Sequence, residues 1–281
     1  MGDARYVRLT GRGLHSGRHA EVKLSRIDGP LVFRTRRGAA SLAELIVAGT
    51  DLGVSVRSDD VGLELESVEH FFAALGGLSI RSGIAVESEA REMPLLDGAA
   101  LTFAAALASL GAPAERSTLR ILRDGIVRIG ASTYEFTTGE RATLEVTAVF
   151  DAKKIGRQTA EWDGSPDAFL RNIAGARTFG FRRDEAVLRE RGRALGVDPK
   201  SVMVLDDDGN VEAPGAPARY TEFARHKLLD LVGDLYLYGG PPLGRVRATR
   251  PGHGATRLAM DAALSQRIVG SSPSTSPSSP R

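Results

Sequence analysis

The segment His226-Lys227-Leu228-Leu229-Asp230, followed one helical turn later by Asp234, decides how this chain is interpreted. Apolar residues recur around it at helical spacing, which predicts an amphipathic helix over about 222–237 with one buried face. His226 and Asp230 are four positions apart, so their side chains lie about 6 Å apart on one side of that helix. Such a pair can bind one divalent cation and favours zinc, iron or manganese over calcium or magnesium. The alternative interpretation is an ordinary helical ion pair.

The composition is that of a globular protein with an ordinary surface. The 281 residues are enough for one large domain or two modest ones, and 42% of them are hydrophobic. Lys and Arg number 37 against 35 Asp and Glu, so the net charge of +2 does not favour a nucleic-acid partner. Neither a signal segment nor an apolar run of about 18 residues is present, so we expect a cytoplasmic protein without a transmembrane segment.

The chain contains no cysteine. Disulfides, thiolate zinc sites and cysteine nucleophiles are therefore excluded. Any metal ion must be held by histidine, aspartate, glutamate or backbone oxygen, which suits a catalytic site better than a structural one.

The order of predicted elements is similar in the two halves of the chain. The first half comprises a strand meander, a helix capped by Ser67, a strand and an alanine-rich helix, at about 6–65, 68–75, 83–87 and up to 110. The second half comprises strands at about 119–122, 126–129, 134–137, 144–150, 202–205 and 243–248, and helices at about 166–174, 184–195, 222–237 and 255–268. This repetition predicts an α+β fold of two related two-layer domains, each a strand meander plus helix–strand–helix.

The predicted domain boundaries follow from composition. We expect a first domain at 1–112 and a second at 118–269, joined by a linker rich in small and polar residues. The Ser/Pro-rich stretch 270–281 is expected to be a disordered tail.

Five histidines are available for chemistry: His15, His19, His70, His226 and His253. His70 follows Glu69 near the start of the first helix, so it is either a surface or capping residue or a third metal ligand. Glu69 would then be a base beside the metal, since a catalytic site keeps one position for water.

The remaining histidines lie in turns or strands. His253 lies in a glycine-flanked turn and is either a surface residue or a general acid close to the metal. His15 lies in a glycine-punctuated hairpin that lacks the Gly-Lys-Ser/Thr of a phosphate-binding loop. His19 has no evident partner and is expected on the surface.

Several segments, taken together, resemble the bacterial UDP-3-O-acyl-N-acetylglucosamine deacetylase family, the zinc amidases of lipid A synthesis in Gram-negative bacteria. The matching segments occur in family order: Gly13-Leu14-His15-Ser16-Gly17, Val68-Glu69-His70, Met93-Pro94-Leu95-Leu96-Asp97-Gly98, Ala176-Arg177-Thr178-Phe179-Gly180-Phe181, Val204-Leu205-Asp206-Asp207, Arg225-His226-Lys227-Leu228-Leu229-Asp230, Gly233-Asp234-Leu235 and Gly252-His253. The resemblance implies a hydrolase that removes acetate from UDP-3-O-[(3R)-3-hydroxyacyl]-N-acetylglucosamine.

The resemblance also implies the ligand set and the active-site location. His70, His226 and Asp230 would hold one Zn²⁺ per chain, with Fe²⁺ as the alternative metal. Glu69 would be the general base. The active site would lie between the two domains, the first contributing Glu69 and His70 and the second the other groups.

Further roles are implied for residues around this site. Thr178 would stabilise the oxyanion, and His253, oriented by Asp234, would stabilise charge and protonate the leaving amine. The substrate contacts implied are Lys227, Phe179, Phe181 and Arg250. The implied partner is a small acylated UDP-sugar, and we expect a monomer, with peripheral proximity to a membrane left open.

Departures from the family pattern leave two alternatives. Pro251 and Ala255-Thr256-Arg257 flank His253 where the family usually has Ser and Asn, and Arg81-Ser82 replaces an Asp-Asn pair. The stretch 49–60 matches poorly, and 209–220 is unusual. The alternatives are a related zinc deacetylase acting on another N-acetylated sugar nucleotide, and a non-catalytic sugar-nucleotide binding protein.

Overall fold

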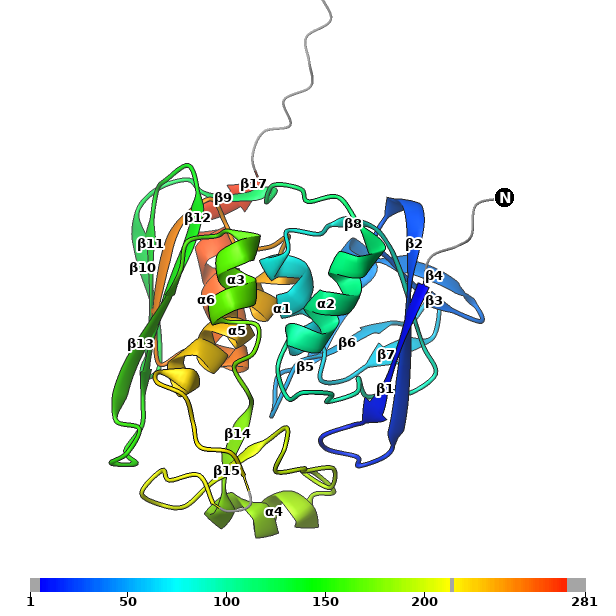
Figure 1. The fold of residues 1–281 in the computed structure, drawn as a ribbon. Helices are drawn as coiled ribbons and strands as arrows, with labels where there is room; N and C mark the ends of the chain where they lie inside the picture. Colours follow the sequence, from blue (N-terminus) through cyan, green and yellow to red (C-terminus); the bar gives the residue numbers. More distant parts are fainter. Residues whose placement is uncertain (1–5, 213–214, 272–281) are drawn as a thin grey trace, which may run out of the picture.

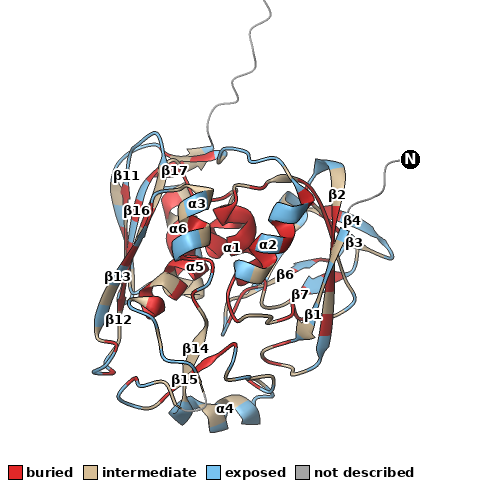
Figure 2. Ribbon diagram, in the orientation of Figure 1, coloured by how far each residue is buried: buried red, intermediate tan, exposed pale blue. Residues whose placement is uncertain are grey.

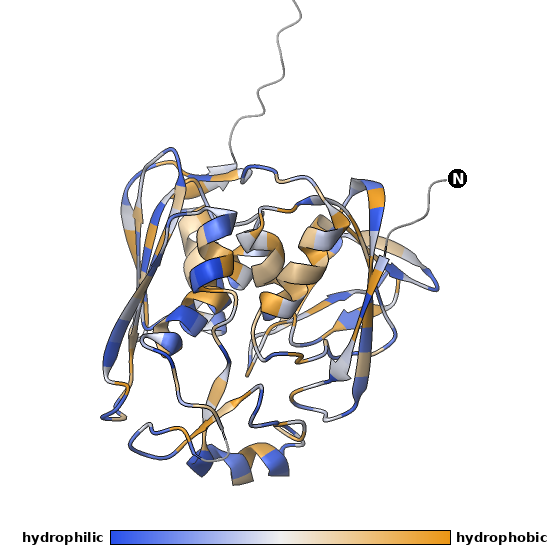
Figure 3. Ribbon diagram, in the orientation of Figure 1, coloured by the Kyte–Doolittle hydropathy of each residue, from blue (hydrophilic) through white to orange (hydrophobic). Residues whose placement is uncertain are grey.

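Two five-stranded sheets form opposite sides of the molecule, and the helices lie between them (Figure 1). The computed structural model describes residues 6–212 and 215–271. Buried residues concentrate in the helical layer, where α1 (Glu69–Gly77) and α5 (Glu222–Tyr236) are almost entirely buried (Figure 2). Figure 3 shows that α1 and α2 consist mainly of hydrophobic residues, whereas α3, part of α5 and the strands mix hydrophobic and hydrophilic residues.

The first sheet has the strand order β1-β2-β8-β3-β4. The last strand in sequence, β8, lies in the middle, antiparallel to β2 and parallel to β3. The elements of this half are β1 (Tyr6–Arg12), β2 (His19–Pro30), β3 (Val32–Thr35), β4 (Gly38–Ser41), β8 (Ser82–Ser88) and α2 (Leu101–Leu110), with a small sheet of β5 (Ile46–Gly49), β6 (Ser55–Ser58) and β7 (Leu63–Leu65).

The second sheet repeats this topology, in the order β10-β11-β16-β12-β13. Its last strand, β16, again lies in the middle, antiparallel to β11 and parallel to β12. The strands are β10 (Gly125–Ile129), β11 (Ser132–Thr137), β12 (Ala142–Val149), β13 (Arg157–Trp162) and β16 (Gly244–Thr249), and the helices packed between the sheets are α3 (Pro166–Asn172), α5 and α6 (His253–Ser265). The prediction of an α+β fold with two similarly ordered halves is confirmed.

Smaller elements complete the second half. Strands β9 (Leu119–Ile121) and β17 (Val269–Ser271) pair with each other, so the first two residues of the expected tail belong to a strand. The rest of that tail, 272–281, lies outside the described residues. Below the sheets in Figure 1, β14 (Phe179–Phe181) and β15 (Met203–Leu205) pair in parallel and carry α4 (Glu185–Glu190) between them.

The helices α1 and α5 occupy equivalent places in the two halves, because each precedes the central strand of its sheet. Their backbones approach very closely at Gly233, where a Cβ atom would lie only 2.1 Å from the carbonyl oxygen of Glu69. The rings of Phe72 and Tyr236 stack nearby with centroids 5.5 Å apart. One continuous hydrophobic core therefore includes side chains from both halves.

Two predicted helix boundaries are wrong. Val68, not Ser67, is the N-cap of α1, and Ser67 adopts a left-handed backbone with φ +55°. The helix predicted over 184–195 covers only Glu185–Glu190, since it ends at the C-cap Arg191 and the next residue, Gly192, has φ +68°. By contrast, Ser165 caps α3 as predicted, accepting a hydrogen bond from the backbone of Ala168 at 3.2 Å.

The described residues contain no helix that is both long enough and apolar enough to cross a bilayer.

The close crossing of α1 and α5 predicts that replacing Gly233 in α5 by alanine destabilises the protein. At an exposed helical position, Gly→Ala stabilises by about 1 kcal/mol. At Gly233 the new methyl group would force α1 and α5 apart, so we expect Gly233→Ala to reduce the free energy of unfolding by about 1–3 kcal/mol. Denaturant unfolding measures this change. Gly175→Ala is the control, because its Cβ would meet Leu101 at 3.7 Å, and an equal effect of both substitutions would contradict the prediction.

Candidate metal centre and active site

His70, His226 and Asp230 form a buried cluster where α1 crosses α5. The Nε2 atoms of His226 and His70 lie 3.5 and 3.8 Å from Oδ1 of Asp230, and the three potential ligand atoms are within 4.8 Å of one another. Two ligands that each lie about 2 Å from one ion are at most about 4 Å apart, so small movements suffice to bind a single cation. One ligand comes from the first half and two come from the second.

The protonation states of the three side chains in the cluster are suited to binding a metal cation. Burial lowers the pKa of His70 to about 3 and also lowers the pKa of His226, so both rings stay neutral and can donate a lone pair. Nδ1–H of His226 donates to the carbonyl of Ala176 at 3.0 Å, which leaves Nε2 free to face Asp230. Burial opposes ionisation of Asp230, but His226 and Lys227 hold its pKa well below the ordinary value. Two imidazoles and one carboxylate are a ligand set typical of catalytic zinc.

Lys227 neutralises the second oxygen of the aspartate. Its Nζ lies 2.9 Å from Oδ2 of Asp230, while Oδ1 faces the histidines. Burial opposes the charge of Lys227, yet Asp230 raises its pKa above the ordinary value, so the ammonium persists at the edge of the site.

Glu69 precedes His70 in α1 and places a second carboxylate beside the cluster. Its Oε2 accepts a hydrogen bond from the backbone N–H of Val54 at 2.8 Å. Burial raises the pKa of Glu69, although the charge of His253 and the Val54 N–H oppose that rise. A buried carboxylate with a raised pKa, next to a metal site, is suited to accept a proton from water near neutral pH.

His253 begins α6 and is held by Asp234 of α5, whose Oδ1 lies 2.8 Å from Nδ1. Burial lowers the pKa of His253, but Asp234, together with Asp230 and Glu69, more than offsets this and raises it to about 10. The ring is therefore a cation at neutral pH, oriented by a carboxylate. Such a group can stabilise developing negative charge and deliver a proton.

The residues of the cluster, together with Glu69, Lys227 and His253, line a cavity of about 540 Å³. The cavity is of the size of small-molecule sites, and most of its lining is apolar, with Arg182, Asp184 and Glu185 as further charged residues. The walls are contributed by Leu14, Met93, Pro94, Leu95, Phe103, Phe179, Phe181, Val187, Leu188, Ala194, Val197, Val202 and Val204. The segment between β14 and β15 thus supplies much of one wall.

Four of the five further predicted site residues line this cavity. Thr178, Phe179, Phe181 and Lys227 are all in its lining, and the Phe179 ring lies 5.8 Å from the ring of His226. Arg250 does not line the cavity. It is exposed in the turn before α6, where its backbone N–H donates to the backbone carbonyl of Thr147 at 2.8 Å.

The departure at position 256 from the family pattern lies in the interior. Thr256 is buried and its hydroxyl lies 3.0 Å from that of Tyr134, so this change affects how α6 packs on the second sheet.

Two contributors to the site were missed by the sequence analysis. His15 is buried and lines the cavity, and the stretch Leu52–Val54 lies directly against Glu69. Leu52–Val54 lies between two strands and has no periodic pattern. Two signals marked the hairpin of His15: its flanking glycines and its match to a segment of the family.

The chain is similar to known deacetylases over most of its length. Residues 4–265 match the family described as LpxC: UDP-3-O-acyl N-acetylglycosamine deacetylase. The UDP-3-O-acyl-N-acetylglucosamine deacetylase of Brucella melitensis biotype 2 is 35% identical over 274 residues, covering 94% of this chain and 95% of the relative. Proteins of the same name from Xylella fastidiosa strain Temecula1 and Pseudomonas entomophila are 34% and 32% identical, covering 92% and 88% of this chain and 87% and 84% of the relatives.

Removing one ligand is expected to abolish metal binding. His226→Ala leaves one imidazole and one carboxylate, and we expect its metal content to fall from about one ion to below about 0.1 ion per chain. Elemental analysis after dialysis measures the content and identifies the metal. His19→Ala, which alters an exposed histidine, should keep the wild-type content. Full metal occupancy in His226→Ala would remove this histidine from the ligand set.

The Asp234–His253 pair predicts a shift in the alkaline limb of the pH profile. Because Asp234 raises the pKa of His253 to about 10, the cation is lost only as pH rises through that value. In Asp234→Asn the pKa of His253 falls, and we expect the alkaline limb of the kcat/KM profile to shift to lower pH by about 1–3 units. Asp261→Asn alters an exposed carboxylate on α6 and serves as the control. If the alkaline limb of the kcat/KM profile stays at the same pH in Asp234→Asn, His253 is not the group that titrates there.

Proposed function

The chain belongs to the UDP-3-O-acyl-N-acetylglucosamine deacetylase family, and from this premise we propose which of its residues carry out the reaction. It hydrolyses the acetamide of a UDP-3-O-acyl-N-acetylglucosamine to acetate and a free amine, in lipid A biosynthesis. The observation that carries the assignment is the buried pair of histidines with Asp230, which line one largely apolar cavity together with Glu69 and His253.

The proposed metal centre consists of His70, His226 and Asp230, holding one Zn²⁺ per chain. The neutral imidazoles and the ionised carboxylate support this ligand set, and Fe²⁺ is the alternative to be distinguished by elemental analysis. When bound, the cation supplies Lewis acidity, which makes water easier to deprotonate and the acetamide carbonyl easier to attack.

Glu69 acts as the general base in the proposed mechanism. Its carboxylate accepts one proton from the water that attacks the acetamide carbon, and its raised pKa makes it basic enough for this step near neutral pH. The N–H of Val54 fixes one carboxylate oxygen, which leaves the other to face the reaction. Thr178, in the cavity lining, is proposed to donate to the carbonyl oxygen as negative charge develops there.

His253 completes the reaction in this proposal. As a cation it stabilises the same negative charge, and it then gives its Nε2 proton to the leaving nitrogen, so that the C–N bond breaks to an amine and acetate. Asp234 keeps the ring charged and oriented throughout. Lys227, Phe179 and Phe181 are proposed to contact the substrate from the cavity wall, and Arg250 to reach the sugar or diphosphate from outside it.

The wider setting is also proposed. We propose a monomer, since the cavity needs no residue of a second chain to bring the proposed groups together, and a nucleotide-sugar substrate supports a cytoplasmic location. Val187 and Leu195 are exposed on the segment that lines the cavity, which supports a position near a membrane surface. The two halves are proposed to be separate domains, 1–112 and 118–269, that share the site.

Glu69→Gln tests the base. The amide keeps the shape of the side chain and can still accept from Val54, but it cannot take a proton, so we expect kcat to fall by about 10²–10⁴-fold with the metal retained. Acetate release and elemental analysis are the measurements. Glu64→Gln, a change of an exposed glutamate, should behave as wild type. Wild-type acetate release by Glu69→Gln would show that another group is the base.

The apolar cavity predicts a preference for acylated substrate. We expect kcat/KM for UDP-3-O-acyl-N-acetylglucosamine to exceed that for UDP-N-acetylglucosamine by at least about 10²-fold, because each buried CH₂ contributes about 0.8 kcal/mol. Equal turnover would favour the related deacetylase of another sugar nucleotide. Binding of both compounds without acetate release would favour the non-catalytic protein.

A further inference from the structure

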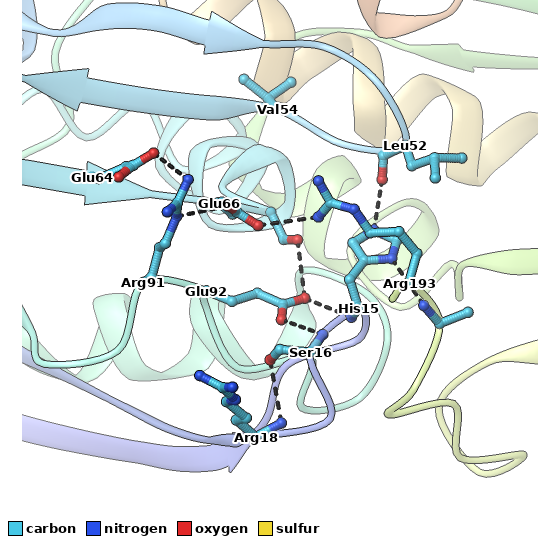
Figure 4. Close-up of polar contacts among 12 residues, drawn as sticks. His15, Ser16, Arg18, Leu52, Val54, Glu64, Glu66, Arg91, Glu92 and Arg193 are labelled. Atoms are coloured by element: carbon cyan, nitrogen blue, oxygen red, sulfur yellow. Dashed lines mark hydrogen bonds and ion pairs between the residues drawn. The ribbon is translucent and has the colours of Figure 1, made fainter. Parts of the chain in front are cut away.

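The segment 182–202 between β14 and β15, called the wall segment below, contacts the hairpin loop 13–17 of the first half (Figure 4). The N–H of Leu195 donates to the carbonyl of His15 at 3.0 Å, and the N–H of Gly196 donates to that of Leu14 at 2.9 Å. The contact is too close for a larger residue, since a Cβ on Gly196 would lie 2.1 Å from the carbonyl oxygen of Gly13. The wall of the cavity is therefore fixed to the opposite half of the molecule by backbone contacts.

A buried carboxylate holds the hairpin loop in place. Oε1 and Oε2 of Glu92 accept hydrogen bonds from the backbone N–H groups of His15 and Ser16, at 2.7 and 2.8 Å (Figure 4). Glu92 is 5% exposed, and charge-assisted hydrogen bonds in such surroundings are strong and directional. The Glu66 carboxylate adds ion pairs to Arg193 of the wall and to Arg91, at 3.1 and 2.8 Å.

The imidazole of His15 connects the wall to a second segment. Its Nδ1 accepts from the N–H of Ala194 at 3.4 Å, so Nε2 carries the hydrogen and donates to the carbonyl of Leu52 at 2.9 Å. Leu52 has a left-handed backbone, with φ +59°, which a leucine keeps only where its surroundings hold it. The hydrogen bond from His15 is one such constraint.

The segment that begins at Leu52 ends on the proposed base. Gly53 packs so closely on Glu69 that a Cβ would lie 3.0 Å from Oε1, and the next N–H, of Val54, donates to Oε2 at 2.8 Å. A continuous path of short contacts thus runs from the wall, through His15 and Leu52, to the Glu69 carboxylate.

We infer that Glu92 and His15 are positioning residues that couple the docked wall to the placement of Glu69. The wall residues Leu188, Ala194 and Val197 line the apolar part of the cavity, so an apolar substituent bound there contacts the segment that His15 holds. Binding of this substituent favours the docked wall and thereby the reactive position of the base. The inference rests on the proposed roles of Glu69 and of the cavity, and it adds a reason why an acyl chain would accelerate the chemical step as well as tighten binding.

The test compares Glu92→Gln, His15→Ala and His15→Gln, with Glu89→Gln as a matched control. Glu89 is an exposed glutamate near Glu92 and lies outside the path. Each protein is assayed for acetate release from acylated and unacylated UDP-N-acetylglucosamine, for metal content, and for amide hydrogen exchange in a peptide covering 52–54.

Glu92→Gln and His15→Ala are expected to lower kcat for the acylated substrate by about tenfold or more, with KM changed by less than about threefold, because a displaced base costs rate more than binding. Exchange in 52–54 should become faster, and the rate advantage of the acylated substrate should shrink. His15→Gln should recover much of kcat, since its amide can donate to Leu52. Glu89→Gln should match wild type.

Three outcomes would overturn the inference. They are wild-type kcat in both Glu92→Gln and His15→Ala, lower kcat with unchanged exchange in 52–54, and a loss of kcat that follows a loss of metal. Equal losses in His15→Gln and His15→Ala would remove the hydrogen bond to Leu52 as the cause. If the wild-type protein releases no acetate, the proposed function fails, while hydrogen exchange still decides whether Glu92 and His15 hold the 52–54 segment.

Discussion

The contact on which the site depends is the crossing of α1 and α5 at Gly233. Only glycine permits the backbone of α5 to approach the carbonyl of Glu69 this closely, and that approach brings His70 of one half next to His226 and Asp230 of the other. A wider crossing, usual between helices at about 8–10 Å, would separate the three proposed ligands beyond the reach of one ion. The equivalent positions of the two helices in the two similar sheets explain how a repeated architecture produces a single site.

The site also shows how buried charges are tolerated when they are matched. Asp230 is shared between two neutral histidines and Lys227, while Asp234 pairs with the His253 cation. Isolated burial of any one of these ions would be strongly unfavourable, and it becomes acceptable because opposite charges and hydrogen bonds compensate the lost hydration. The same burial raises the pKa of Glu69, which supports its proposed role as the group that accepts a proton.

The two halves of the molecule differ most where the substrate would lie. The first half adds the small sheet of β5, β6 and β7, whose first loop contains Leu52, and the second half adds the segment between β14 and β15. Both additions meet at His15, which lies between them (Figure 4). The common architecture thus provides the proposed metal ligands, and the additions provide apolar walls of the cavity and the contacts to the proposed base.

Local sequence pattern determined much of this protein. The apolar spacing of 222–237 placed His226 and Asp230 on one side of a helix, the absence of cysteine restricted the metal ligands, and the repeated element order indicated an α+β fold with two similar halves. These features depend on residues within one or two turns of each other, so they can be read along the chain. The roles of the site residues remain predictions, since their positions alone do not test them.

Only the tertiary structure decided which distant groups meet. The left-handed Ser67, the short α4, the contact of Val54 with Glu69 and the ring of His15 between Leu52 and Ala194 have no periodic signature. Ala194 is 179 residues from His15, and such contacts depend on how two sheets and their helices pack. The sequence determined which side chains could form the site, and the close packing of α1 on α5 determined that they do, because their alignment depends on backbone separations that sequence spacing does not encode.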